Sequence, residues 1–326
     1  MKILILRFSS IGDVILTTPV LRCLKQQAGA EVHFLTKRQF EPILTPNPNV
    51  DRVFSFQKDI YKILPKLKKE HYDWVIDLHH NLRSLQVKLA LNQPSRSFDK
   101  LNFEKWWLVH TGIDLLPDVH IVHRYLDTIS HLGVEYDGQG LDYFIPPDEE
   151  VNLARVSPNL ESGSYVAFAI GATHATKRLP PDKIAAVCKN LRTPVVLLGG
   201  KSEAEAGGLI ASEAGAHVIN LCGQLSLHQS ASVVRQAAKV ATHDTGMMHI
   251  AAAFQREIVS IWGNTIPKFG MYPFYPDGMD RNTTIEISGL KCRPCSKIGY
   301  AQCPKKHFRC MNALDIAQIC SALSIK

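Results

Sequence analysis

The residues with most chemical potential lie in segment 243–249, which reads HDTGMMH. It follows an apolar run at 237–242 and precedes small residues with helical spacing, which predicts a strand, a tight loop and a helix. Free N–H groups and the positive end of the helix dipole at such a place attract phosphate. Asp244 and Thr245 would then contact a ligand beyond the carboxyl end of a strand. The alternative, that they only cap the helix, stays open on this segment alone.

The turn after the first expected strand, residues 9–13 (SSIGD), is a second candidate site. It lacks the G-x-G-x-x-G fingerprint, and the chain contains no G-x-x-x-x-G-K-[ST], which argues against dinucleotide binding at this turn and against a P-loop enzyme. Gly12 permits close backbone approach, and Ser9 and Ser10 can donate hydrogen bonds. Asp13 is either a helix cap or a carboxylate that takes a proton from an acceptor hydroxyl.

Two loops in the second half of the chain suit a nucleotide. Residues 171–178 (GATHATKR) supply hydroxyls and cations before a helix, as a pyrophosphate leaving group requires. A solvated basic loop is the alternative. Residues 199–203 (GGKSE) form a glycine turn whose Glu203 can accept bonds from a ribose diol or a base, or simply occupy a helix's first turn.

Composition places limits on the class of protein. The 326 residues suit two domains, and 45% hydrophobic with 21% charged residues is typical of a soluble globular chain. No stretch reaches the roughly 18 apolar residues of a membrane span, and the N-terminus resembles a buried strand rather than a signal peptide. We therefore expect eight reduced cysteines in a cytoplasm. The net charge of +7 favours a nucleotide, a phosphorylated glycan or a membrane face as partner, or marks only a mildly basic enzyme.

Strand and helix patterns alternate twice along the chain. The expected strands are 2–8, 31–36, 52–56, 73–78 and, more weakly, 96–98, then 165–170, 194–198, 217–220, 239–242 and 258–262. The expected helices are 14–27, 60–70, 84–91 and 120–132, then 181–190, 202–213, 226–238, 247–254 and 313–323. Residues 137–163 have linker composition. This order predicts an α/β protein of two doubly wound domains with a cleft between them.

Several of these motifs resemble one family. Residues 7–19 (RFSSIGDVILTTP) resemble the opening of bacterial heptosyltransferases, glycosyltransferase family nine, and 244–249 resemble its other signature. The loop from Thr173 to Lys177 and the strand end at 261–263 match in order and spacing. The cysteine-containing segment 292–310 is similar to a tail in the second-heptose branch of the family.

The resemblance implies a GT-B fold, with two Rossmann-like doubly wound domains facing a central cleft. Residues 1–150 would bind the acceptor, residues 151–312 would bind the nucleotide-sugar, and the helix in 313–326 would pack back toward the first domain. Transfer would be inverting and would require no metal.

The resemblance also implies roles for single residues. Asp13 would be the general base, and Lys177 would neutralise the departing diphosphate. Asp244 would hold the sugar hydroxyls and Glu203 the ribose. The residues around the phosphates would be Thr173, Thr245, Gly246 and His249. His243 departs from the family pattern and would add a phosphate contact or nothing, and Arg178 would share the role of Lys177.

The acceptor is expected to be anionic. On the acceptor side we place Ser9, Ser10 and Gly12, with Arg83 and Arg96 in first-domain loops. Together with Lys100 and Lys105, these arginines would meet phosphate or acidic sugar groups of a membrane-borne glycolipid, and Trp106 and Trp107 would lie near its lipid. The alternative is a solvated basic face with core aromatics.

Four cysteines have the spacing C-x₂-C-x₇-C-x₆-C, namely Cys292, Cys295, Cys303 and Cys310, with His307 between the last two. Four such ligands suit a structural zinc ion. Reduced buried cysteines, or a loop held by packing alone, are the alternatives.

We therefore expect an inverting glycosyltransferase that moves heptose or a related sugar from a nucleoside-diphosphate donor, ADP-heptose by family resemblance, to a lipopolysaccharide core acceptor. It would act in the cytoplasm, peripherally at the inner face of the inner membrane, without nucleic acid as a partner. One rival is a nucleotide-sugar epimerase of the same fold, which would release a free sugar. Another is a non-catalytic nucleotide-sugar or glycolipid-binding protein, which would bind donor without turnover.

Overall fold

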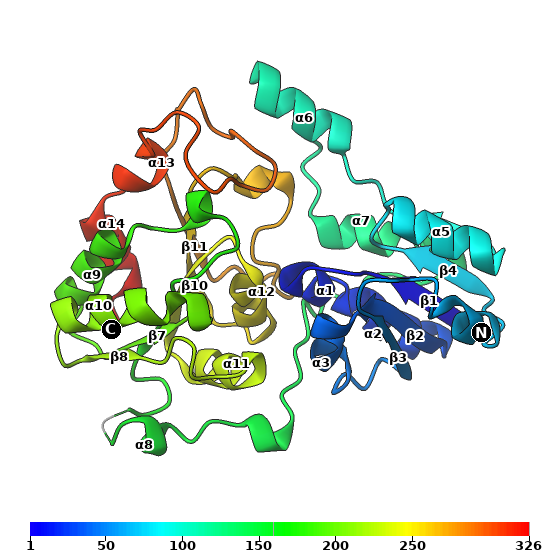
Figure 1. The fold of residues 1–326 in the computed structure, drawn as a ribbon, viewed down its shortest axis with the longest axis horizontal. Helices are drawn as coiled ribbons and strands as arrows, with labels where there is room; N and C mark the ends of the chain where they lie inside the picture. The colour runs from blue at the N-terminus through cyan, green and yellow to red at the C-terminus, as the bar shows by residue number, and fades with distance from the viewer. Residues whose placement is uncertain (159, 326) are drawn as a thin grey trace. The chain divides into compact units, whose positions relative to one another are not determined.

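The structure is a computed structural model that describes residues 1–158 and 160–325. It divides into two compact units (Figure 1). Unit 1 comprises Met1–Leu101 and Val119–Phe144, and unit 2 comprises Asn102–Asp118 and Ile145–Lys326. The chain passes from unit 1 to unit 2 for the last time between Phe144 and Ile145, near the expected domain boundary at residue 150. Residues 102–118, which we expected in the first domain, group with unit 2. Each unit contains one parallel sheet, which confirms the predicted α/β class of two doubly wound domains.

The sheet of unit 1 has the order β3-β2-β1-β4-β5, and every neighbouring pair is parallel. Its strands are β1 (Lys2–Leu6), β2 (Glu31–Lys37), β3 (Arg52–Phe56), β4 (Trp74–Asp77) and β5 (Ser95–Ser97). The central strands are nearly continuous apolar runs because helices cover both faces of the sheet.

Several helices of unit 1 are shorter than the sequence predicts, whereas α5 begins two residues earlier than expected. They are α1 (Ile11–Ile15), α2 (Thr18–Ala28), α3 (Glu41–Leu44), α4 (Leu64–Lys68), α5 (Leu82–Leu91) and α7 (Ile121–Asp127). The helix expected over 14–27 is divided before Pro19, and the helix expected over 60–70 begins only beside Pro65. Both prolines lie in a first turn, where no N–H partner is required. Helices α4 and α5 pack against each other, as do α2 and α7.

Unit 2 has the strand order β11-β10-β9-β6-β7-β8, again parallel throughout. The strands are β6 (Val166–Ala169), β7 (Val195–Leu198), β8 (Val218–Asn220), β9 (Lys239–His243), β10 (Glu257–Trp262) and β11 (Asn282–Glu286). We did not predict β11, because Thr283 and Thr284 give this edge strand an exposed, polar pattern.

The helices of unit 2 are α6 (Asn102–Thr111), α8 (Leu153–Val156), α9 (Pro181–Asn190), α10 (Ala204–Ala214), α11 (Leu227–Gln236), α12 (Gly246–Ala253), α13 (Arg309–Asn312) and α14 (Ile316–Leu323). In the part of the chain that the structure describes, no helix is both long and apolar enough to cross a membrane.

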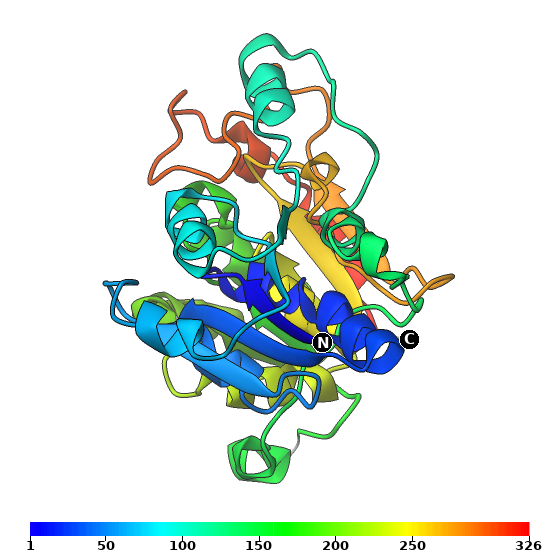
Figure 2. The same ribbon diagram turned by 90° about the vertical axis from the view of Figure 1, so that its right-hand side faces the viewer.

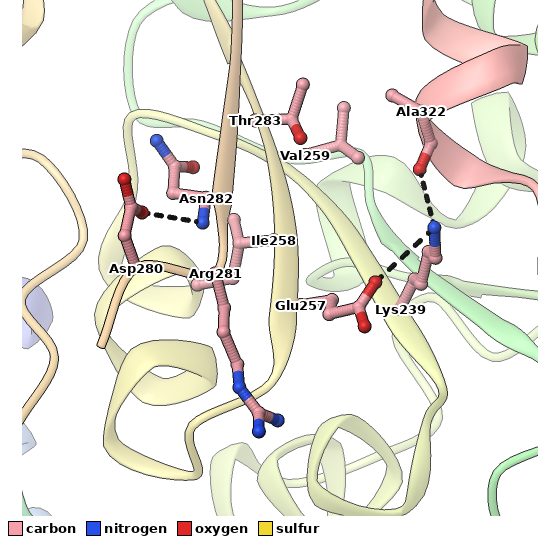
Figure 3. Close-up of a pocket in the computed structure, with 9 residues that line it drawn as sticks. All are labelled: Lys239, Glu257, Ile258, Val259, Asp280, Arg281, Asn282, Thr283 and Ala322. Atoms are coloured by element: carbon pink, nitrogen blue, oxygen red, sulfur yellow. Dashed lines mark hydrogen bonds and ion pairs between the residues drawn. The ribbon is translucent and has the colours of Figure 1, made fainter. Parts of the chain in front are cut away.

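The last helix, α14, packs on the unit that contains it. It contacts α9 and strands β9 to β11, and the Lys239 Nζ donates to the Ala322 carbonyl at 2.9 Å. The structure therefore groups α14 with unit 2, whereas packing of this helix back toward the first domain, which the family resemblance implies, stays a prediction. Figure 3 shows a pocket beside this contact, where Lys239 also pairs with Glu257 at 3.4 Å. These residues begin strands β9 and β10, so the pocket lies at the amino edge of the sheet.

Candidate active site

Asp13 lies just beyond the carboxyl end of β1, at the third position of α1. Its Oδ2 accepts from the Ser10 backbone N–H at 3.0 Å and from the Ser10 hydroxyl at 2.8 Å, while its Oδ1 pairs with Arg7 at 2.5 Å. The side chain therefore caps the helix and also forms an ion pair. The two interpretations of Asp13 as cap and as functional carboxylate do not exclude each other.

The surroundings of Asp13 keep it ionised. Burial alone would raise its pKa, but the Arg7 charge and the two Ser10 hydrogen bonds outweigh burial and hold the pKa below its usual value. At neutral pH the group is a carboxylate, which is the form that can accept a proton.

Arg7 is a site residue for which we predicted no role. Its Nε donates to the Ser9 carbonyl at 2.8 Å and its NH1 to the Leu78 carbonyl, so it joins the ends of β1 and β4. Its side chain is 9% exposed. The sequence signal that could have identified Arg7 is its positive charge near the end of a predicted apolar strand, in the segment that resembles the family.

The neighbouring loop after β4 is held by a fully buried carboxylate. Asp77 accepts from the N–H groups of His79 and His80 and from the Ser84 hydroxyl at 2.8 Å, and it pairs with Lys88 at 3.2 Å. Burial and the nearby Arg7 charge lower the pKa of His79 to about 3. The carboxyl edge of this sheet thus presents an ionised Asp13 beside a guanidinium and a neutral imidazole.

The remaining acceptor-side residues differ in exposure. Ser10 is exposed and Gly12 is buried, while Arg83, in the first turn of α5, and Arg96, in β5, are both exposed. None of the described contacts joins either arginine to Asp13.

The tryptophans expected near the acceptor lie on α6. Trp106 is 47% exposed and stacks on His110 with ring centroids 4.5 Å apart, so it is not a core residue. The segment that carries it groups with unit 2, for example through the ion pair between Asp114 and Lys268. The structure therefore does not group these aromatics with unit 1, where we expected the acceptor loops.

In unit 2 the predicted donor residues gather at the carboxyl edge of the sheet. Lys177, in a short 3-10 helix after β6, pairs through Nζ with the Asp244 Oδ2 at 2.5 Å. The same oxygen accepts from the Thr265 hydroxyl at 2.9 Å, so the loops after β6, β9 and β10 meet at one carboxylate. Thr245 occupies the N-cap position of α12 but makes no side-chain cap bond, and the Asp244 carboxylate is engaged by Lys177 and Thr265. The structure therefore gives no side-chain capping bond to either residue, and the ligand role of this segment stays a prediction.

Beside this carboxylate, Arg178 joins the loop after β6, residues 171–178, to the loop after β7, residues 199–203. Its Nε donates to the Ala172 carbonyl at 2.6 Å, and its NH1 lies 3.4 Å from the Glu203 Oε1. Glu203 also accepts from the Gly200 N–H at 2.9 Å, which closes the glycine turn. A Cβ at Gly199 would lie 2.8 Å from the Glu203 Cβ, so only glycine fits there. Arg178 therefore holds Glu203, whereas Lys177 holds Asp244.

His243 positions the end of the loop after β6. It ends β9, is fully buried, and its Nε2 accepts from the Leu179 N–H at 2.9 Å. Burial lowers its pKa to about 4, so the ring is neutral. We expected a phosphate contact or no role, and the structure shows a supporting role instead. Of the other predicted phosphate residues, Thr173 is exposed, Gly246 begins α12, and His249 is buried within its first turn.

The cysteine-containing segment 292–310 forms hydrogen bonds with the loops after β6 and β10. Arg293 donates to the carbonyls of Gly263 at 2.6 Å and Thr265 at 2.8 Å. Tyr300 exchanges bonds with Thr176: its N–H donates to the hydroxyl at 2.8 Å and its carbonyl accepts from the Thr176 N–H at 3.2 Å. Sequence reasoning missed the roles of Arg293 and Tyr300 because it considered this segment only as a candidate metal site, through its cysteines and His307.

All eight cysteines are free thiols. The Cys292 Sγ lies 3.7 Å from the His307 Nε2, and burial together with neighbouring thiols raises the pKa of Cys310 to about 11. Within the described ranges, the one group of three ligand atoms within 4.8 Å of one another is Glu31, His33 and Glu70. Cations of Lys2 and Arg52 already pair with that group. Zinc at the four clustered cysteines stays a prediction.

Comparison with known proteins identifies the family. The family model described as glycosyltransferase family 9 (heptosyltransferase) matches residues 60–306. Lipopolysaccharide heptosyltransferase 2 of Escherichia coli K12 is 25% identical over 302 residues, covering 82% of this chain and 84% of that protein. Lipopolysaccharide heptosyltransferase 1 of Campylobacter coli is 25% identical over 296 residues, covering 81% and 84%.

Solved structures share the fold. The E. coli ADP-heptose lipopolysaccharide heptosyltransferase II superposes with a TM-score of 0.70 at 22% identity, covering 98% of this chain and 99% of that chain. The E. coli heptosyltransferase WaaC with ADP gives a TM-score of 0.69 at 21% identity, covering 99% and 100%. The fold is therefore GT-B, as expected, and the chain is a glycosyltransferase that belongs to family 9, the heptosyltransferases.

Proposed function

We propose that this glycosyltransferase moves heptose from ADP-heptose to a lipopolysaccharide core acceptor, with inversion at the anomeric carbon. The observation that carries the proposal is the convergence of three loops of unit 2 on the Asp244 carboxylate, with Lys177 and Thr265 as its partners. Its support from relatives is that two of them are lipopolysaccharide heptosyltransferases and that one solved neighbour holds ADP.

In the proposed reaction, an acceptor hydroxyl oxygen attacks the anomeric carbon as the bond from that carbon to the ADP oxygen breaks. The Asp13 carboxylate takes the hydroxyl proton, and ADP leaves on the opposite side of the sugar, which gives inversion. A carboxylate of lowered pKa suffices, because the hydroxyl becomes acidic only as the new bond forms.

On the donor side, Lys177 exchanges part of its interaction with Asp244 for the diphosphate, whose charge grows as the bond breaks. Asp244, relieved of one cation, accepts from the sugar hydroxyls. The phosphates are surrounded by Thr173, Thr245, Gly246 and His249, and Glu203 takes the ribose. No metal is needed for this charge balance.

For the acceptor we propose an anionic glycolipid presented at the inner face of the inner membrane, with the protein in the cytoplasm. The exposed guanidinium groups of Arg83 and Arg96 would meet its phosphates or acidic sugars. These side chains lie in the unit that carries Asp13.

The test is a transfer assay with purified protein, a lipopolysaccharide core acceptor and ADP-heptose, with UDP- and GDP-sugars as parallel donors. We expect an acceptor product heavier by one heptosyl residue, with release of ADP, from the ADP-sugar alone. Free heptose or an isomerised donor would support the epimerase instead. Donor binding without any product would support a non-catalytic binding protein.

A further inference from the structure

Helix α5 of unit 1 presents leucines to solvent. Leu82, Leu85 and Leu89 are 79%, 44% and 71% exposed, and their spacing of three and four residues places them on one face. The opposite face, with Val87 and Leu91, is buried in the core of unit 1. Single exposed leucines are ordinary, but three on one short helix form an apolar strip that water solvates poorly.

A basic surface adjoins this strip. Helix α4 packs against α5, and Figure 2 shows α4 in light blue beside α5 in cyan. The α4 region carries five exposed lysines that make no ion pair with any described residue: Lys58, Lys62, Lys66, Lys68 and Lys69. Asp59 is the only acidic residue among residues 57–69. Glu70, which follows them, is neutralised by Lys2 and Arg52.

We propose that this leucine–lysine face, made of the three α5 leucines and the five lysines of residues 58–69, docks the enzyme on an anionic lipid bilayer. The leucines enter the interface between headgroups and acyl chains, and the lysines meet lipid phosphates. A second copy of the chain suits the face poorly. In a two-fold contact, the same lysines would oppose each other across the interface.

The location of the face fits a lipid-linked acceptor, and to that extent the inference rests on the proposed function. Leu82 lies four residues after Leu78, whose carbonyl accepts from Arg7, the ion-pair partner of Asp13. Lys58 follows the carboxyl end of β3, at the same edge of the sheet. A bilayer held there would bring a lipid-anchored sugar close to the surface of unit 1 that carries Asp13.

The test measures sedimentation of the full chain with vesicles of phosphatidylcholine alone or mixed with phosphatidylglycerol. We expect binding to the anionic vesicles that weakens with salt, and little binding to the neutral ones. The triple variant Leu82→Gln, Leu85→Gln and Leu89→Gln keeps good helix formers and should lower binding at least tenfold. Each of Lys62→Glu and Lys66→Glu should lower it about fivefold or more.

Matched controls lie on unit 2. Leu209→Gln replaces a leucine of α10 that is 66% exposed, and Lys189→Glu and Lys305→Glu replace exposed lysines. These variants should bind vesicles like the wild type. Equal losses in the controls and in the α5 and α4 variants would overturn the proposal.

Two further readouts separate this inference from its alternatives. Light scattering that shows a concentration-dependent dimer, lost in the leucine variant, would assign the face to a second copy and overturn the bilayer. Transfer to a water-soluble, deacylated acceptor should be unchanged in the leucine variant. A different outcome would separate the two proposals. If even the wild type does not transfer heptose to the deacylated acceptor, but all variants bind vesicles as expected, the proposed function is wrong and the docking face is supported.

Discussion

Replacing Asp13 by Asn tests its proposed role as general base. Asn keeps the shape of the side chain and one oxygen for Ser10, but it cannot take the acceptor proton. A positioned general base accelerates a reaction by about 10²–10⁴-fold. We therefore expect kcat to fall by that factor, or about 2.7–5.5 kcal/mol in the activation barrier. The affinity for ADP-heptose should change little, because the residues that we propose bind the donor lie in unit 2.

The substitution also has a structural cost that must be kept separate. Removing one partner of a buried ion pair costs about 3–5 kcal/mol. The cost here should lie at or below the low end, because Asp13 is 18% exposed and Arg7 keeps the carbonyls of Ser9 and Leu78. Asp51→Asn is the matched control. Asp51 pairs with Lys25 at 2.6 Å in the same unit, and we assign it no role in catalysis.

The assay combines kcat from product formation at saturating donor, donor Kd from calorimetry, and the melting temperature of each variant. We expect Asp13→Asn to be folded, to bind donor and to turn over slowly, and Asp51→Asn to keep its kcat. An Asp13→Asn enzyme with kcat near that of the wild type and a weakened donor Kd would refute the assignment.

Three further predictions follow from the same contacts. Lys177→Met should weaken ADP binding and lower kcat, both measured as above, and unchanged ADP affinity would contradict a phosphate role for the lysine that pairs with Asp244. Arg7→Lys should move the acid limb of the kcat/KM profile to higher pH. The intact pair holds the Asp13 pKa below its usual value, so activity persists as pH falls until that carboxylate is protonated, and a weaker pair brings its protonation to higher pH. If the acid limb of the kcat/KM profile does not move, a group other than Asp13 sets its position. Finally, if the four clustered cysteines bind zinc, metal analysis should find one zinc ion per chain, and chelation should lower the melting temperature, whereas metal-free protein of unchanged stability would exclude the site.

The proposed donor site was predictable as a group of neighbouring loops because parallel strands bring their carboxyl ends to one side of a sheet. Lys177 and Asp244 are 67 residues apart in sequence, yet each follows a strand of the same sheet, and so they meet. The same rule placed Asp13 and Glu203 at the ends of β1 and β7. Local pattern was therefore enough to identify the loops.

Contacts that depend on long loops were not predictable in this way. Arg293 and Tyr300 reach the donor loops from a segment without regular periodicity, where no rule of spacing indicates a partner. The grouping of α14 with unit 2 depends on burial of Ile319 and Leu323 in the core of that unit. That of α6 depends on long-range contacts such as Lys105 over the Phe269 ring, and neither has a local sequence signal. The starts of α2 and α4 lie beside Pro19 and Pro65, a local signal that the expected helices over 14–27 and 60–70 did not use.

The central claim is that unit 2 holds the nucleotide-sugar and unit 1 supplies the base. Hydrogen–deuterium exchange of the full chain with and without ADP tests this division most directly. We expect ADP to protect the loops after β6, β7, β9 and β10, around Lys177, Glu203, Asp244 and Thr265, and to leave residues 9–13 unchanged. Protection confined to residues 9–13 and the loop after β4, with the loops of unit 2 unaffected, would contradict it.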